Sequence, residues 1–110
     1  MDTEQVEMKR AADIAALNDA FRRGNPMRYV VTQGVQDECG AMNVLFAVRH
    51  FSDFNEDNDP YGEHDFGQIT LNSRQLFWKI DYYDSGLSGW CDPLSPDCRR
   101  VLTVMLAEEY

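Results

Sequence analysis

The stretch that decides the fold is "HDFGQITLNSRQLFWKIDYYD", residues 64–84. Residues 64–71 and 74–84 are rich in β-branched and aromatic side chains, which favour strands. Alternate residues of a strand point to opposite faces. In the second segment one face is therefore apolar and carries Leu76, Trp78, Ile80 and Tyr82, and the other is mixed and carries Phe77, Lys79, Asp81 and Tyr83. Because Asn72-Ser73 can form a tight turn between the segments, we expect an antiparallel hairpin.

The N-terminal region predicts a long helix at residues 3–23. Good helix formers dominate this segment, and Ile14, Leu17 and Phe21 recur at helical spacing on one apolar face. Acidic residues lie in its first turns and basic residues in its last turn, which suits the helix dipole. Gly24 then provides a C-cap.

Two further elements are expected between this helix and the hairpin. Residues 27–34 predict a short strand that ends at Gly34. Residues 37–54 predict a second helix, although Gly40 weakens its first turn by about 1 kcal/mol relative to alanine. The positions that keep the helical period are Ala41, Val44, Leu45, Val48 and Phe51.

After the hairpin, residues 85–97 predict a loop because they are rich in glycine, proline and serine. Residues 97–110 favour a last helix, with Ser95 as a cap and Pro96 at its first position. The β-branched residues of "VLTVML" keep a strand open as the alternative. The order of elements predicts a single α+β domain over residues 1–110, a small antiparallel sheet with two to three helices packed against it.

Composition limits the function. Nineteen Asp and Glu against ten Lys and Arg give a net charge of −9. Such a field repels nucleic acid and membranes and attracts basic proteins. The three cysteines form no C-x-x-C pair, which favours reduced thiols and a cytoplasmic protein. No signal peptide or membrane span is predicted, and we expect a monomer without a cofactor.

The charge is concentrated in one part of the chain. Residues 50–97 carry ten Asp and Glu but only Arg74 and Lys79 as bases, so this segment holds eight of the nine net negative charges. Tyrosine and tryptophan side chains are interleaved with the carboxylates, a composition that is typical of an interface. The residues that we expect to bind a partner are Asp53, Glu56, Asp57, Asp59, Glu63, Asp65, Asp81 and Asp84.

Metal binding is a weaker interpretation of the same stretch. Asp53, Asn55 and Asp57 match the first positions of a calcium-binding EF-hand loop, but the match breaks at Asn58 and at His64, where glycine and a bidentate glutamate are required. The other interpretations are a turn stabilised by Asn and Asp side chains and a general acidic interaction module.

An enzyme is a further alternative. It would be a metal-dependent or hydrolytic enzyme that uses His64 with Glu63 or Asp65, or one that uses a pair such as Cys39 with His50. No phosphate-binding loop, nucleotide fingerprint or G-x-S-x-G motif supports it. We therefore expect a protein without catalytic residues.

The segments "DNDPYGEHDFG", "FWKIDYYD" and "RVLTVMLAEEY" resemble a bacterial family of small proteins known mainly as a domain of unknown function and often found on mobile elements. The likeness runs from about Ile14 to Tyr110. It implies a bacterial host cell and no catalytic residue.

Size, acidity and this background are similar to those of type I anti-CRISPR inhibitors, with subtype I-C as one candidate system. Some of these inhibitors are anionic DNA mimics that occupy the DNA channel of the Cascade surveillance complex. The resemblance implies a partner with a basic DNA-binding channel, where carboxylates stand in for phosphates.

Overall fold

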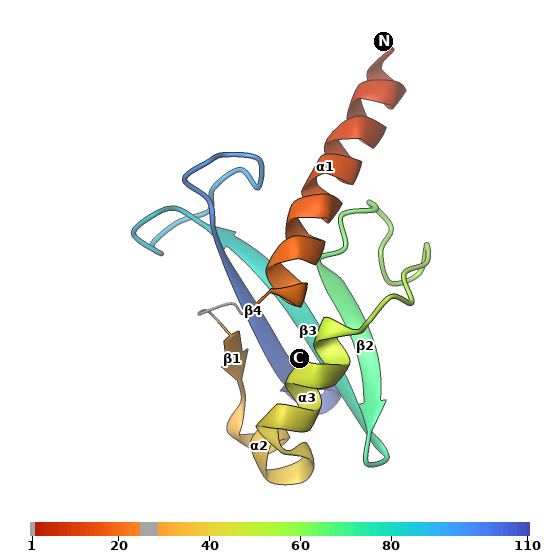
Figure 1. Cartoon of the computed structure of the whole chain (residues 1–110), viewed down its shortest axis with the longest axis vertical. Coiled ribbons are helices and arrows are strands. Elements are labelled where there is room, and N and C mark those ends of the chain that lie inside the picture. The colour runs from red at the N-terminus through yellow and green to blue at the C-terminus, as the bar shows by residue number, and fades with distance from the viewer. Residues whose placement is uncertain (1, 25–28) are drawn as a thin grey trace.

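The computed structural model describes residues 2–24 and 29–110. Its elements are α1 (Thr3–Arg23), β1 (Tyr29–Val31), α2 (Gln33–Cys39), α3 (Ala41–Arg49), β2 (Phe66–Leu71), β3 (Arg74–Tyr83), β4 (Arg99–Leu106) and the short 3-10 helix η1 (Ala107–Glu109). The four strands form one sheet in the order β1-β4-β3-β2. The sheet is mostly antiparallel, but β1 runs parallel to β4. The α+β prediction is confirmed, and α1 and α3 lie over one face of the sheet (Figure 1).

The hairpin forms as predicted. β2 pairs with β3 in antiparallel register from Phe66 with Lys79 to Leu71 with Arg74. Asn72 and Ser73 have φ values of 51° and 65°, which suits a tight type I′ turn between twisted strands. The apolar face of β3 enters the core, where Leu76 and Trp78 are fully buried.

The segment favoured as a last helix is a strand, so the helix prediction for residues 97–110 is wrong. β4 lies in the middle of the sheet, between β3 and β1. Leu102 and Val104 are fully buried there, and β-branched residues fit such a two-sided pairing. Ser95 and Pro96 belong to a turn in which the Ser95 hydroxyl accepts a hydrogen bond from the backbone N–H of Asp97 at 3.2 Å.

The elements before the acidic segment also differ from expectation. The strand expected at residues 27–34 covers only Tyr29–Val31, and its first two residues lie outside the described part of the chain. Thr32 caps α2, so Gly34 lies in a helix. Gly40 has a φ of 79° and separates α2 from α3, because glycine adopts this left-handed conformation without a steric penalty. The single helix expected at residues 37–54 is therefore two helices, and it ends five residues early.

Helix α1 has the predicted bounds, and of the three residues expected on its apolar face Ile14 is buried and Phe21 packs against the core. Its buried residues are Ile14, Ala15, Asn18 and Arg22. Leu17, expected on the apolar face, is 46 % exposed. The first turns are exposed and project beyond the sheet (Figure 1). None of the helices in the described residues is long and apolar enough to cross a membrane.

Candidate partner-binding surface

The acidic loop, residues 50–65, joins α3 to β2 and carries six of the eight expected partner-binding residues. Its first half is folded by side-chain amides. The Asn55 Oδ1 atom accepts hydrogen bonds from the backbone N–H groups of Asp57 at 2.9 Å and Asn58 at 3.1 Å. The Asn58 Nδ2 atom donates to the Asp53 carbonyl at 2.8 Å. These bonds use asparagine side chains, so they leave the carboxylates of this half free.

Asp59 has a structural role instead of a binding role. Its side chain is only 4 % exposed, and its Oδ1 atom accepts hydrogen bonds from the backbone N–H groups of Glu63 and His64, both at 3.1 Å. The carboxylate therefore closes the second half of the loop from inside. The expectation that Asp59 presents its charge to a partner is wrong, because a buried and hydrogen-bonded carboxylate is not available to a second protein.

The two expected partner-binding residues outside the loop, Asp81 and Asp84, also contact other groups of the protein. Asp84 accepts hydrogen bonds from the backbone N–H groups of Gly86 at 3.1 Å and Ser88 at 3.0 Å. The bond from the Ser88 backbone is the main cause that lowers the pKa of Asp84. Asp81 pairs with Lys79 at 3.1 Å. Asp84 thus stabilises a turn, and Asp81 has a lysine of its own strand as a counter-ion.

Asp53, Glu56 and Asp57 are exposed. No lysine, arginine or histidine of the described residues forms an ion pair with any of them. Neighbouring carboxylates without counter-ions produce a local negative potential that attracts a basic surface. These three side chains are therefore the part of the expected site that remains open to a partner.

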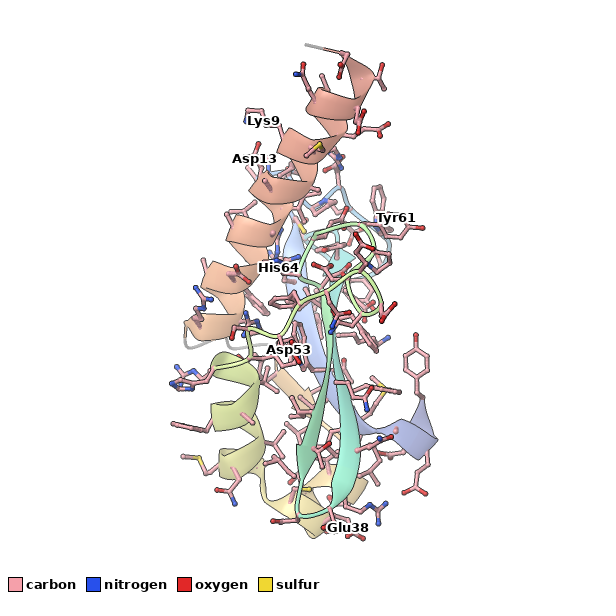
Figure 2. The ribbon with its side chains drawn as sticks, turned by 90° about the vertical axis from the view of Figure 1, so that its right-hand side faces the viewer. Lys9, Asp13, Glu38, Asp53, Tyr61 and His64 are labelled. Carbon is pink, nitrogen blue, oxygen red and sulfur yellow. The ribbon has the colours of Figure 1, made fainter. Side chains whose placement is uncertain are left out.

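A groove lies beside the loop, between the projecting half of α1 and residues 59–63. This α1 groove has a volume of about 650 Å³. Glu4 and Glu7 line it from the helix and Glu63 from the loop. Tyr61, which is 81 % exposed, stands at its edge. Figure 2 shows Tyr61 on the outer side of the loop.

A second hollow lies on the other side of the loop. It has a volume of about 490 Å³ and is lined by Asp53 and Asp57 together with Phe66 and Phe77 of the uncovered sheet face. Of the open carboxylates, Asp53 and Asp57 border only this second hollow, whereas other carboxylates line the α1 groove beside Arg10. Each hollow combines acidic with aromatic side chains. Such combinations suit lysine and arginine side chains, whose charged ends bind carboxylates while their stems or guanidinium planes pack on aromatic rings.

Glu63 and Asp65 lie half-buried at the end of the loop. Burial is the main cause that raises the pKa of each carboxyl, and neighbouring carboxylates raise it further, Asp65 acting on Glu63 and Asp59 on both. The raised pKa values therefore report mainly the loss of water around these carboxyl groups, with a smaller contribution from the neighbouring negative charges.

The enzyme alternative requires His64 to pair with Glu63 or Asp65, but His64 pairs with neither of them. Its Nδ1 atom lies 3.0 Å from Asp19 Oδ1, and its Nε2 atom lies 3.7 Å from Asp59 Oδ2. The ring also stacks on Phe54 with centroids 3.9 Å apart. Both ring nitrogens therefore face carboxylates of the protein, and His64 joins α1 to the loop (Figure 2).

Cys39 and His50, the other pair considered for catalysis, are also far apart. Cys39 is buried at the end of α2, with its thiol 3.7 Å from the Leu71 carbonyl. His50 follows the last residue of α3, and the nine residues of that helix span about 13 Å. Among the residues that the structure describes, no three His, Cys, Asp or Glu side chains are grouped so that they could hold a metal ion.

Helix α1 holds the acidic loop at both ends. Arg22 donates to the carbonyls of Val48 at 2.6 Å and Phe51 at 2.8 Å, where the loop begins. Asn18 donates to the Glu63 carbonyl at 2.9 Å, near its end. With the Asp19–His64 contact, these bonds fix the loop against the helix. The position of the loop against α1 is therefore set by tertiary contacts, whereas its internal turns are made by its own side chains.

The sequence pattern did not single out the residues that α1 contributes. Glu4 and Glu7 are the acidic residues of the first turns of α1, which the sequence pattern relates only to the helix dipole. They lie three residues apart and so share a face. Asn18 and Arg22 follow Ile14 at intervals of four residues. Polar residues at helical spacing on an apolar face are the signal that could have revealed a buried network.

The fold and the site define a small α+β protein whose acidic loop is held by its N-terminal helix. The chain belongs to the DUF3768 family, described as a protein of unknown function, which matches residues 31–109. Comparison with curated proteins and with solved structures found no match. Helix α1 precedes the matched residues, whereas the acidic loop and the whole sheet apart from Tyr29 and Val30 lie within them.

Proposed function

We propose that the protein is an anti-CRISPR inhibitor, an acidic DNA mimic that binds the basic DNA channel of a type I Cascade surveillance complex and blocks target DNA. The single observation that carries the proposal is the group of exposed loop carboxylates without counter-ions, formed by Asp53, Glu56 and Asp57. In such a channel lysine and arginine side chains neutralise phosphates. Carboxylates on a firmly held loop can take the place of those phosphates.

The position of the loop supports this role. Its two ends are held by buried side chains of α1, so little conformational entropy would be lost when a partner binds. Association with a basic channel would be fast and would weaken as salt is added. The choice of a type I complex rests on the resemblance in size and acidity to type I inhibitors.

The test is an electrophoretic mobility experiment with a purified type I Cascade complex and its target DNA. Increasing amounts of the protein should remove the shifted DNA band, and this effect should weaken at higher salt. Protein added after the DNA has bound should act more slowly, because it must wait for DNA to dissociate. If the shifted band is unchanged at a large excess of protein, inhibition of that complex is ruled out.

Two double variants with the same change of charge localise the effect. Glu56→Lys with Asp57→Lys should weaken inhibition by about tenfold or more, equivalent to about 1.4 kcal/mol. The control is Asp37→Lys with Asp97→Lys, at exposed positions outside the loop, and it should retain most of the inhibition. Equal losses in both variants would show that only net charge matters.

A further inference from the structure

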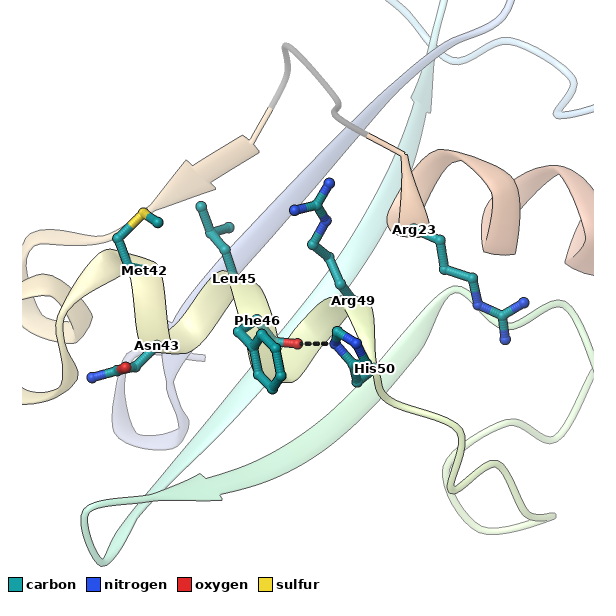
Figure 3. Close-up of a pocket in the computed structure, with 7 residues that line it drawn as sticks. All are labelled: Arg23, Met42, Asn43, Leu45, Phe46, Arg49 and His50. Carbon is teal, nitrogen blue, oxygen red and sulfur yellow. Dashed lines mark hydrogen bonds between the residues drawn. The ribbon is translucent and has the colours of Figure 1, made fainter.

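A cationic and apolar patch lies on the outer face of α3, next to the end of α1. It surrounds a hollow of about 790 Å³ that is lined by Arg23, Met42, Phe46, Arg49 and His50 among others. Figure 3 shows the rings of Phe46 and His50 side by side along the helix. Within the described part of the chain no carboxylate lines this hollow, although the sequence contains 19 Asp and Glu. We call this surface the α3 patch.

The apolar part of the α3 patch is not explained by the core. Met42 is 82 % exposed and Phe46 is 66 % exposed, and they lie one turn apart. The core uses the opposite side of the helix, where Val44 and Val48 are fully buried. Methionine, aromatic and arginine side chains are enriched at protein interfaces and acidic ones are depleted. The composition of the α3 patch is therefore that of a binding surface.

The charged part of the α3 patch is partly preorganised. The Nε and Nη2 atoms of Arg49 donate to the Gly24 carbonyl at 3.1 Å and 2.6 Å, which fixes its guanidinium group. His50 donates from Nδ1 to the Phe46 carbonyl at 2.9 Å and stacks on the Phe46 ring at 4.2 Å. No carboxylate of the described residues forms an ion pair with Arg23 or Arg49. The patch thus offers positive charge beside an ordered apolar surface.

We propose that the α3 patch docks an acidic amphipathic helix of a partner protein. Apolar residues of that helix would pack on Met42 and Phe46, and its carboxylates would lie near Arg23 and Arg49. A helix in a groove uses anchors one turn apart, which is the spacing of Met42 and Phe46. The positive charge of the α3 patch favours an acidic helix as its occupant. A second copy related by a twofold axis would place the same bases against each other, and the net charge of −9 disfavours nucleic acid.

This inference does not depend on the proposed function, because the α3 patch shares no residue with the acidic loop except His50 at its first position. The two sites also differ in the sign of their charge. An acidic partner helix at α3 and a basic channel at the loop can therefore be tested separately.

The test uses a fluorescently labelled synthetic peptide of about four helical turns. It carries leucines at i, i+3, i+4 and i+7 and glutamates on the remaining face. Fluorescence anisotropy should show binding to the wild-type protein with a Kd of about 10–100 µM. A matched peptide with serines in place of the leucines should bind at least about tenfold more weakly.

Three variants assign the binding to the patch. Phe46→Ser and Arg23→Glu should each weaken binding of the glutamate peptide by about tenfold. Arg99→Glu is the matched control, because Arg99 is an exposed arginine on β4 and the substitution makes the same change of charge as Arg23→Glu. It should weaken peptide binding by less than about twofold. All three positions are exposed, so the urea unfolding midpoints should stay close to that of the wild type.

Three results would overturn the proposal. The first is absence of binding of the glutamate peptide to the wild-type protein. The second is an equal loss for Arg23→Glu and Arg99→Glu, which would show attraction without a defined site. The third is a dimer in size-exclusion chromatography that Phe46→Ser dissociates, because a second copy would then be the occupant of the patch.

Discussion

Replacement of Arg22 by methionine should be the most informative single change, because this residue fixes the start of the acidic loop. Arg22 is fully buried. It donates to the carbonyls of Val48 and Phe51 at 2.6 Å and 2.8 Å and to Asp19 Oδ1 at 3.1 Å. Methionine fills much of the same space but offers no donor, so the Phe51 carbonyl loses its partner and the Val48 carbonyl keeps the Phe51 backbone N–H at 3.3 Å.

The size of the effect follows from these contacts. Leaving the Phe51 carbonyl without a partner destabilises the fold by about 1–3 kcal/mol. Removing one partner of a buried ion pair typically costs about 3–5 kcal/mol, which is an upper bound here because the Asp19 side chain is 21 % exposed. Two features of Arg22 reduce the loss. The pKa of its guanidinium group is lowered, mainly by burial. The Nε atom of Arg22 is also buried without a hydrogen-bond partner. We therefore expect a net loss of about 3 kcal/mol, a large share of the roughly 5–15 kcal/mol of a typical domain.

Urea unfolding followed by tryptophan fluorescence measures this loss, since the Arg22 guanidinium lies 5.2 Å from the ring centroid of Trp78. Hydrogen exchange at residues 50–65 should also become faster, because the loop loses its anchor. Arg23→Met is the matched control at an exposed position and should stay within about 0.5 kcal/mol of the wild type. A loss for Arg22→Met below about 1 kcal/mol would refute the view that Arg22 holds the loop.

The remaining predictions concern the hairpin and the end of the acidic loop. Gly67→Ala should lower the free energy of unfolding by about 2 kcal/mol, because the new Cβ would lie 2.3 Å from Trp78 Nε1; an unchanged urea midpoint would contradict this. Glu63→Gln with Asp65→Asn should stabilise the protein at neutral pH. Both pKa values are raised on folding, so the native state binds protons more tightly and stability falls as the pH rises from the unfolded to the native pKa. The gain should vanish near pH 4, about the unfolded pKa, and a gain that is equal at both pH values would exclude this cause.

The long-range pairing of β4 explains the main error in the secondary structure. Residues 99–106 contain both helix formers and β-branched residues, so local preference does not choose between helix and strand. The choice comes from β1 and β3, which bind both edges of β4. By contrast, the β2–β3 hairpin needs only its period of two and the turn at Asn72-Ser73, both of which are local.

The candidate site shows the same division. The concentration of carboxylates in residues 53–65 is visible in the sequence, but only the structure shows that Asp53, Glu56 and Asp57 are exposed. The inward position of Asp59 was not visible, because the sequence does not distinguish an aspartate that faces solvent from one that accepts hydrogen bonds from backbone N–H groups. The contribution of Glu4 and Glu7 to the α1 groove also required the packing of α1 beside the loop.

The sequence by itself determined the α+β class, helix α1, the hairpin and the acidic character of the loop, because each depends on neighbouring residues and their spacing. Only the tertiary structure decided that β4 is a strand, that Arg22 and Asn18 hold the loop, and that a cationic patch lies on α3. These features depend on which buried groups find hydrogen-bond partners and which side chains remain outside the core, and both are settled by contacts between residues far apart in the chain.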